Sequence, residues 1–207
     1  MSLIDDKNAL AFEFGRLCSE AGAAIMEIYN SDFTSRSKDD ASPVTDADEL
    51  AEKIILAGLE KLLPGIPVLA EESFSAGFRP EVGSTFVLVD PVDGTKEFIN
   101  KNGEFTVNIA LIENRAPTAG CVYAPARERI YIGGTKAWAC ALKAGQPIIP
   151  EPFAPLRTRS PRPGGRPVAS SRSHPHPAPH AHPQPAPAAA PPPPPAPTPA
   201  PPPHDTL

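Results

Sequence analysis

Two aspartates spaced three residues apart, Asp90 and Asp93, are the residues of this chain best placed to hold a metal ion. They follow the apolar run 86–89, which is typical of a strand buried on both faces. Pro91 has no N–H, so we expect that strand to end at Asp90. Hard divalent cations such as Mg²⁺ bind carboxylate oxygens. The two aspartates by themselves fit an ordinary turn equally well, because Asp, Pro and Gly are common turn residues.

A second acidic pair favours the metal-site interpretation over the turn. The apolar run 66–70 predicts another strand, and Glu71 and Glu72 follow it directly. Two strands that each end in carboxylates are better explained by a shared metal crevice than by chance. Open α/β sheets bind ligands at the carboxyl ends of their strands, and a helix start predicted at 96–99 would offer N–H groups to a phosphate.

The motifs around these acids resemble the signature of a known enzyme family. Segments 70–73 (Ala-Glu-Glu-Ser) and 90–95 (Asp-Pro-Val-Asp-Gly-Thr) are similar to those of the inositol monophosphatase superfamily, whose members are Mg²⁺-dependent, lithium-sensitive phosphomonoesterases. Segment 96–112 resembles more specifically the CysQ-type branch of 3'(2'),5'-bisphosphate nucleotidases. That branch hydrolyses the 3'-phosphate of adenosine 3',5'-bisphosphate, a by-product of sulfur assimilation, to AMP and phosphate. The resemblance extends from Leu3 to about His174.

The resemblance implies a magnesium site that holds two or three ions. Its ligands would be the side chains of Glu71, Asp90 and Asp93 and the main-chain carbonyl of Val92. The charge balance agrees, because residues 1–150 carry 22 acidic and 14 basic side chains, and an acidic protein needs a metal to bind a polyanionic nucleotide. The same balance gives no support for binding to nucleic acid. We therefore expect a small-molecule nucleotide substrate.

The resemblance also implies catalytic and substrate-binding roles. Glu71 and Thr95 would orient the attacking water, and Asp48 would help Thr95 to activate it. Asp48 has a local role as well, because Thr45 is a good helix N-cap and an acid three residues later completes a capping box. The residues expected to bind the substrate are Glu71, Asp93, Gly94, Thr95 and Lys38. For Lys38, a solvated loop lysine is the alternative interpretation.

The predicted elements form a layered α/β fold. Apolar residues at steps of three and four predict amphipathic helices over 3–29 and 45–62, the second ended by Pro64. Four strand-like runs after the acidic motif predict a largely antiparallel continuation of the sheet. They span 105–112, 118–123, 129–132 and 137–142. We interpret residues 1–150 as a metal-binding phosphatase sub-domain, an α+β sandwich similar to the first sub-domain of inositol monophosphatases.

The composition changes sharply near residue 150. Of the 30 prolines, 21 follow Pro150, and so do all five histidines. We expect 151–174 to be a linker and the start of an incomplete second sub-domain, and 175–207 to be a disordered Pro/Ala/His-rich tail or polyproline II. The tail fits an SH3-type ligand or spacer, or weak metal capture by its histidines. A shifted reading frame explains the abrupt loss of the resemblance better.

That loss bears on the expected activity. The late Trp-Asp-x-x-Ala-Gly motif of the family, which supplies a further metal-binding aspartate, is absent from this sequence. The groups that hold the base and ribose also belong mainly to the part that is not matched. We expect a phosphoric monoester hydrolase whose activity is impaired in the chain as written. The alternatives are an inositol or sugar phosphate monoesterase of the same superfamily and a non-catalytic truncated product.

The cysteines and the N-terminal segment indicate a cellular compartment. Cys18, Cys121 and Cys140 have no metal-ligand spacing, so we interpret them as small buried residues of a reducing compartment. The first ten residues lack the features of a signal peptide, and no apolar run approaches the ~20 residues that span a bilayer. We expect a cytoplasmic protein, with peripheral association with the inner membrane left open. The sequence does not indicate an oligomeric state.

Overall fold

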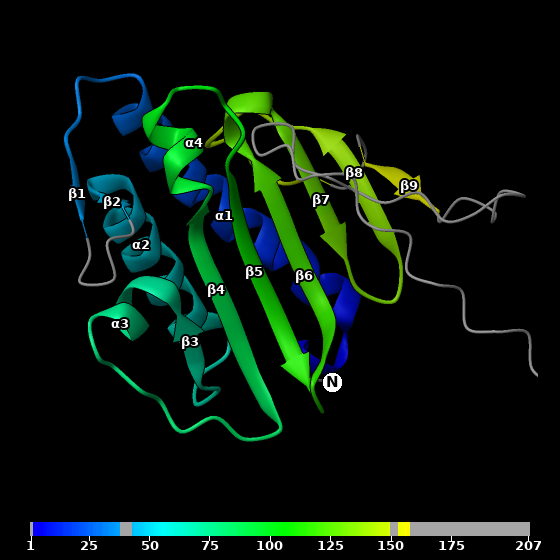
Figure 1. Ribbon diagram of the computed structural model, residues 1–207. Coiled ribbons are helices and arrows are strands. Elements are labelled where there is room, and N and C mark those ends of the chain that lie inside the picture. Colours follow the sequence, from blue (N-terminus) through cyan, green and yellow to red (C-terminus); the bar gives the residue numbers. More distant parts are fainter. Residues whose placement is uncertain (1, 38–42, 150–152, 158–207) are drawn as a thin grey trace, which may run out of the picture. The chain divides into compact units, whose positions relative to one another are not determined.

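The computed structural model describes residues 2–37, 43–149 and 153–157. These residues build a seven-stranded sheet in the order β3-β4-β5-β6-β7-β8-β9 (Figure 1). The strands are β3 (Val68–Ala70), β4 (Thr85–Asp93), β5 (Thr106–Glu113), β6 (Ala116–Ala124), β7 (Arg129–Gly133), β8 (Ala137–Ala141) and β9 (Ala154–Leu156). β3 is parallel to β4, and all the other neighbouring pairs are antiparallel. The predicted α/β class and the antiparallel continuation of the sheet are confirmed.

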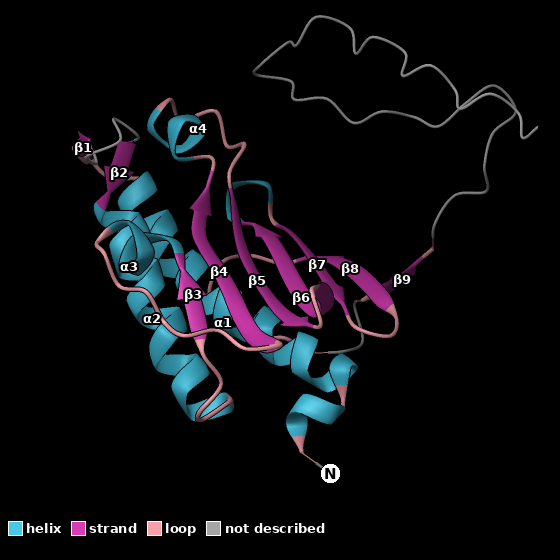
Figure 2. Cartoon of the chain, turned by 60° about the horizontal axis from the view of Figure 1, so that its bottom comes forward, coloured by secondary structure: helices cyan, strands magenta, loops and turns pink. Residues whose placement is uncertain are grey.

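Two long helices, α1 (Lys7–Tyr29) and α2 (Asp46–Leu62), pack on one face of this sheet (Figure 2). Both were predicted from the spacing of their apolar residues. Most of those residues lie on the buried sides of the helices, but Leu50 of α2 is 41% exposed. At Gly22 of α1, an added Cβ would lie 2.5 Å from the ring of Tyr123 on β6. The missing side chain at Gly22 therefore lets the helix lie directly on the sheet.

Short elements connect these layers. They are η1 (Leu3–Asp5), β1 (Ser35–Ser37), β2 (Pro43–Thr45), α3 (Glu71–Ser75), α4 (Thr95–Ile99) and η2 (Pro125–Arg127). β1 and β2 pair with each other in a separate two-stranded sheet. α4 confirms the helix start predicted after the acidic motif. Asn114 and Arg115, both with positive φ, form the predicted turn between β5 and β6.

The course of β4 corrects the prediction that this strand ends at Asp90. The strand continues through Pro91 to Asp93. Its partner β5 pairs Asn108 with Asp90 and Thr106 with Asp93, so one extra residue of β4 bulges out between these pairs. Pro91 lies in the bulge, where no regular ladder bond needs its missing N–H. The bulge also changes which way the residues after Asp90 face.

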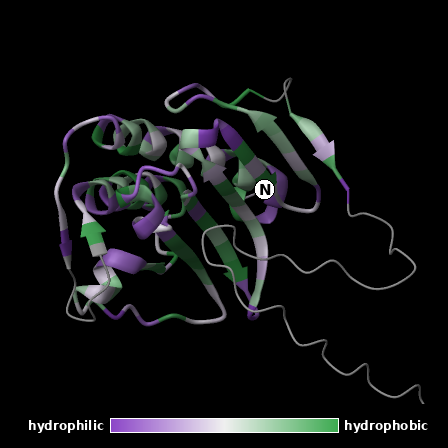
Figure 3. Cartoon of the chain, turned by 45° about the horizontal axis from the view of Figure 1, so that its top comes forward, coloured by the Kyte–Doolittle hydropathy of each residue, from purple (hydrophilic) through white to green (hydrophobic). Residues whose placement is uncertain are grey.

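The described residues cover only one face of the sheet, which corrects the prediction that β4 is buried on both faces. Val87 and Val89 are buried on the helix side, whereas Leu88 between them is 43% exposed. Val122 and Tyr131 are exposed on the neighbouring strands, and the open face has a broad hollow of about 610 Å³. Apolar residues, drawn green in Figure 3, concentrate in the strands of the sheet. The buried core therefore lies between the sheet and the two long helices.

Several sequence predictions fall outside the described residues. Lys38, all five histidines, most of 151–174 and all of 175–207 lie there. Residues 154–156, within the stretch expected to be a linker, form the strand β9 and pair with β8. Cys18, Cys121 and Cys140 are buried and free, as predicted. In the described part of the chain, no helix combines the length and the apolar character that crossing a membrane requires.

Candidate functional site

The parallel pairing of β3 with β4 brings the acidic ends of the two strands together. Ala70 pairs with Val89, so the residues that follow them, Glu71 at the start of α3 and Asp90 of β4, come side by side. Burial, followed by the negative charges of Glu71 and Asp93, raises the pKa of Asp90 to about 8. Of the three carboxylates predicted to hold a metal, the structure thus places Glu71 beside Asp90, and Asp93 lies near enough for its charge to act on Asp90.

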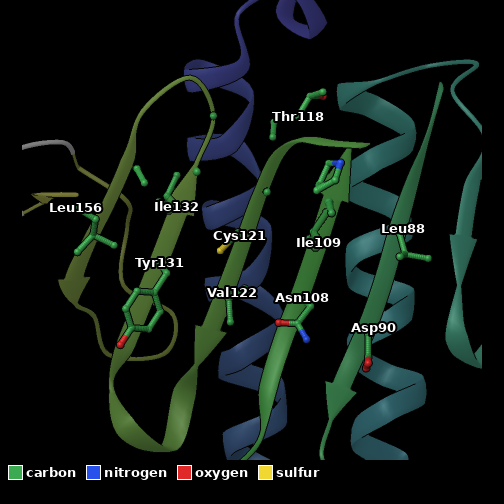
Figure 4. A pocket seen from close by; sticks show the side chains of 17 residues that line it. Leu88, Asp90, Asn108, Ile109, Thr118, Cys121, Val122, Tyr131, Ile132 and Leu156 are labelled. Atoms are coloured by element: carbon green, nitrogen blue, oxygen red, sulfur yellow. The ribbon is translucent and has the colours of Figure 1, made fainter. Parts of the chain in front are cut away.

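Asp90 and Asn108 carry buried oxygen atoms with no hydrogen-bond partner in the described part of the chain. Asp90 Oδ1 and Asn108 Oδ1 are both in this state, and Figure 4 shows the two side chains on the adjacent strands β4 and β5. The other end of the Asn108 amide is engaged, because its Nδ2 donates to Asp93 Oδ2 at 3.1 Å. Buried polar atoms normally have partners, since leaving one unsatisfied costs about 1–3 kcal/mol. These two oxygens therefore suit a cation or its bound water.

The donor set at this edge fits a divalent cation. The negative charges of Glu71 and Asp93 disfavour the ionised form of Asp90, and one carboxylate oxygen of Asp90 is unsatisfied. Oxygen-only donors are the preference of Mg²⁺. Among residues 2–37, 43–149 and 153–157, no three acidic, His or Cys side chains already converge as metal ligands.

Asp48 connects the start of α2 to Thr95 of α4. Its Oδ2 accepts hydrogen bonds from the amide and the hydroxyl of Thr45, at 2.8 and 2.7 Å. Its Oδ1 accepts from the Thr95 hydroxyl at 3.2 Å, and the Val92 carbonyl lies at the same distance from that hydroxyl. Burial raises the pKa of Asp48, against the opposing effect of these hydrogen bonds. The predicted capping box is confirmed, and one carboxylate serves both the cap and Thr95.

Aromatic packing and one glycine hold α4 in place. Phe98 is fully buried, and its ring centroid lies 5.2 Å from that of Tyr29 on α1 and 5.0 Å from that of Phe105. Gly94 precedes α4 with φ of 99°, a left-handed conformation that glycine adopts without strain. An added Cβ there would lie 3.0 Å from the Glu104 carbonyl oxygen. The position of the Thr95 hydroxyl is thus set by packing that extends to α1.

Sequence reasoning missed two residues that hold the predicted site in place. Asn108 of β5 binds Asp93, as described above. Glu52 of α2 is buried, and its carboxylate accepts hydrogen bonds from the amides of Glu72 and Ser73 at 2.7 and 2.8 Å. The available signal for Glu52 was its position one turn after Asp48, on the side of α2 that the apolar pattern marks as buried. An acid at such a position needs partners from another element.

The sequence of this chain is similar to those of known proteins. The model of the family described as "Inositol monophosphatase family" matches residues 7–176. The chain is 49% identical over 126 residues to the 3'(2'),5'-bisphosphate nucleotidase CysQ of Salmonella typhimurium, a match that covers 59% of this chain and 51% of that protein. The chain spans about half the length of the curated relatives it matches.

Solved structures also superpose on this chain. The crystal structure of CysQ from Bacteroides thetaiotaomicron, described as a bacterial member of the inositol monophosphatase family, superposes with a TM-score of 0.57 at 33% identity. That match covers 75% of this chain and 60% of the other. The extragenic suppressor protein suhB from Bartonella henselae superposes with a TM-score of 0.56 at 26% identity, over 65% of this chain and 53% of its own.

Proposed function

The chain belongs to the inositol monophosphatase family, and from that premise we propose that it carries the metal-binding half of a Mg²⁺-dependent phosphomonoesterase. The substrate that we propose is adenosine 3',5'-bisphosphate, which would lose its 3'-phosphate to give AMP. The observation that carries the proposal is the meeting of Glu71, Asp90 and Asp93 at one sheet edge, with Asp90 carrying an unsatisfied buried oxygen. The identity with proteins named 3'(2'),5'-bisphosphate nucleotidase supports this choice of substrate.

In this proposal, different residues of the chain bind the metal and position the attacking water. Glu71, Asp90, Asp93 and the Val92 carbonyl would hold Mg²⁺. When bound, Mg²⁺ supplies charge neutralisation and lowers the pKa of a coordinated water. Thr95 would position the water that attacks phosphorus in line with the ribose 3'-oxygen. The bond between phosphorus and that oxygen breaks, and the ribose oxygen leaves as a hydroxyl, having gained a proton in place of the one that the water gives up. Positioning of this kind accounts for much of the catalysis of phosphoryl transfer.

Asp48 sets the direction in which the Thr95 hydroxyl donates. That hydroxyl has one proton and two acceptors at 3.2 Å, Asp48 Oδ1 and the Val92 carbonyl. When the proton points to Asp48, the lone pairs of Thr95 Oγ1 are left to accept a hydrogen bond from the attacking water. Asp48 is 1% exposed, so its orientation is held by the surrounding protein. We propose that Asp48 and Thr95 act as one unit.

The buried, free state of the three cysteines supports a cytoplasmic location, which we propose on that ground. We also propose that residues 1–207 turn over slowly, because the late aspartate motif of the family is absent from this sequence. The substrate would be a small nucleotide.

The test measures phosphate release with protein in excess of substrate, so that slow turnover is detected. Adenosine 3',5'-bisphosphate is compared with inositol monophosphate and a sugar phosphate, with Mg²⁺, with Mg²⁺ plus Li⁺, and with EDTA. We expect Mg²⁺-dependent, Li⁺-sensitive release that favours the bisphosphate. It should be lost in Asp90→Asn and kept in Asp32→Asn, a matched change at an exposed position.

Three results would contradict the proposal. Release that survives EDTA or the Asp90→Asn change would remove the metal site from the reaction. Preference for inositol monophosphate would overturn the substrate. No release with any substrate would mean that residues 1–207 are not catalytic by themselves.

A further inference from the structure

The carboxylate of Glu52 occupies an unusual position for a charged group. It lies on the buried side of α2 and is 4% exposed. The described residues give it no ion pair. Its partners are the amide of Glu72 at 2.7 Å, the amide of Ser73 at 2.8 Å and the hydroxyl of Ser73. Burying a carboxylate is costly, and hydrogen bonds to charged acceptors are among the strongest that compensate for it.

These bonds substitute for a missing helix cap. α3 begins at Glu71 with Ala70 in the N-cap position, and alanine has no side-chain acceptor. Glu72 and Ser73 are the second and third residues of α3, whose amides would otherwise lack a partner in the helix. Each oxygen of Glu52 takes one of them, Oε2 from Glu72 and Oε1 from Ser73. A residue of α2 thus caps a helix that begins nineteen residues later, at Glu71.

Glu71 lies between two main-chain positions that the structure holds in place. On one side, Ala70 is fixed by its pairing with Val89 in the sheet. On the other side, the amide of Glu72 is fixed by Glu52. The main chain of Glu71 is therefore held from both directions, and its side chain starts beside Asp90.

We propose that Glu52 is a positioning residue, which directs Glu71 toward Asp90 by capping α3 and so sets the affinity of the site for a divalent cation. The inference deepens the proposed function and rests on it. Partners that orient metal ligands typically change metal affinity by about 10–100-fold when they are substituted. We expect a loss of this size when the carboxylate of Glu52 is removed.

The variant that tests this is Glu52→Gln. It keeps the size of the side chain but turns one of the two oxygens into an NH₂ group, which faces an N–H and cannot accept its bond. The matched control is Glu60→Gln, the same chemical change at an exposed position on the same helix. Mg²⁺ binding to the full chain is measured by isothermal titration calorimetry, together with the thermal midpoint of unfolding.

We expect Glu52→Gln to raise the Kd for Mg²⁺ about 10–100-fold and Glu60→Gln to leave it within about twofold. A lower thermal midpoint of Glu52→Gln with an unchanged Kd would overturn the inference, because that pattern describes a purely structural role. If Glu52→Gln does not fold, Glu52→Asp decides. It keeps the charge but withdraws the carboxylate by one methylene, and an unchanged Kd in that variant would equally overturn the inference.

Failure of the proposed function gives a different result. If the unsubstituted chain itself binds no Mg²⁺, the metal site is refuted, and the positioning role falls with it. If the unsubstituted chain binds Mg²⁺ and Glu52→Gln binds it equally well, only the positioning role is refuted.

Discussion

Asp90→Asn offers the most direct test of the crowded carboxylates at the sheet edge. Without metal, burial and the charges of Glu71 and Asp93 raise the pKa of Asp90 from its ordinary value of 3.8 to about 8. The folded chain therefore binds more protons than the unfolded chain between these two pH values. Folding stability contributed by the protonated group is fully present below about pH 4 and is lost as the pH rises through about 8. Asparagine cannot ionise, so the variant should lack this dependence.

The magnitude follows from the interval between the two pKa values. Each pH unit of that interval is worth about 1.36 kcal/mol, so four would amount to ~5 kcal/mol for a completely buried group. Asp90 is only partly buried and is screened by solvent, so we expect about 2–3 kcal/mol. With a urea m-value of about 2 kcal/mol/M, this corresponds to a change of about 1 M in the unfolding midpoint.

The assay is urea unfolding followed by circular dichroism in EDTA, at intervals from pH 5 to pH 9. The unsubstituted chain and the exposed-site control Asp32→Asn should lose stability in parallel as the pH rises, and Asp90→Asn should give a flatter profile. Saturating Mg²⁺ at pH 8 should then stabilise the unsubstituted chain, by about 2.7 kcal/mol at 100 times its Kd, and leave Asp90→Asn unchanged. Identical pH profiles for the chain and Asp90→Asn would refute the reasoning.

Three further substitutions test the packing and the capping, each by urea unfolding. Gly22→Ala should cost about 1–3 kcal/mol, because its Cβ would lie 2.5 Å from the buried ring of Tyr123; an unchanged midpoint would mean that α1 moves away freely. Gly94→Ala should cost about 1–2 kcal/mol for its positive φ, whereas Gly83→Ala, in open space, should be nearly neutral. The unfolding free energy of Asp48→Asn relative to the unsubstituted chain should rise from pH 4 to pH 8, because burial raises the pKa of this carboxyl above its ordinary 3.8 and its ionisation then costs the unsubstituted chain stability; a relative free energy that falls over this interval would contradict the prediction.

The local features of this protein were readable from the sequence because they depend on neighbours a few residues apart. Apolar spacing predicted both long helices, and Thr45 with Asp48 predicted the cap of the second. The hairpin at Asn114 and Arg115 and the antiparallel strands were predicted in the same way. The acidic motifs also identified the family, because their order along the chain is distinctive.

Only the tertiary structure determined how the acidic residues of the site lie relative to one another and which residues position them. The pairing of Ala70 with Val89 places Glu71 beside Asp90, and this register depends on contacts between distant strands. Asp90 acquires its raised pKa only through that neighbourhood. The bulge at Pro91 likewise depends on β5, so the proline rule failed there. Motifs could not identify Glu52, because its partners are main-chain amides. Every residue except proline has such an amide, so the residue types of a sequence do not show which amides a side chain binds.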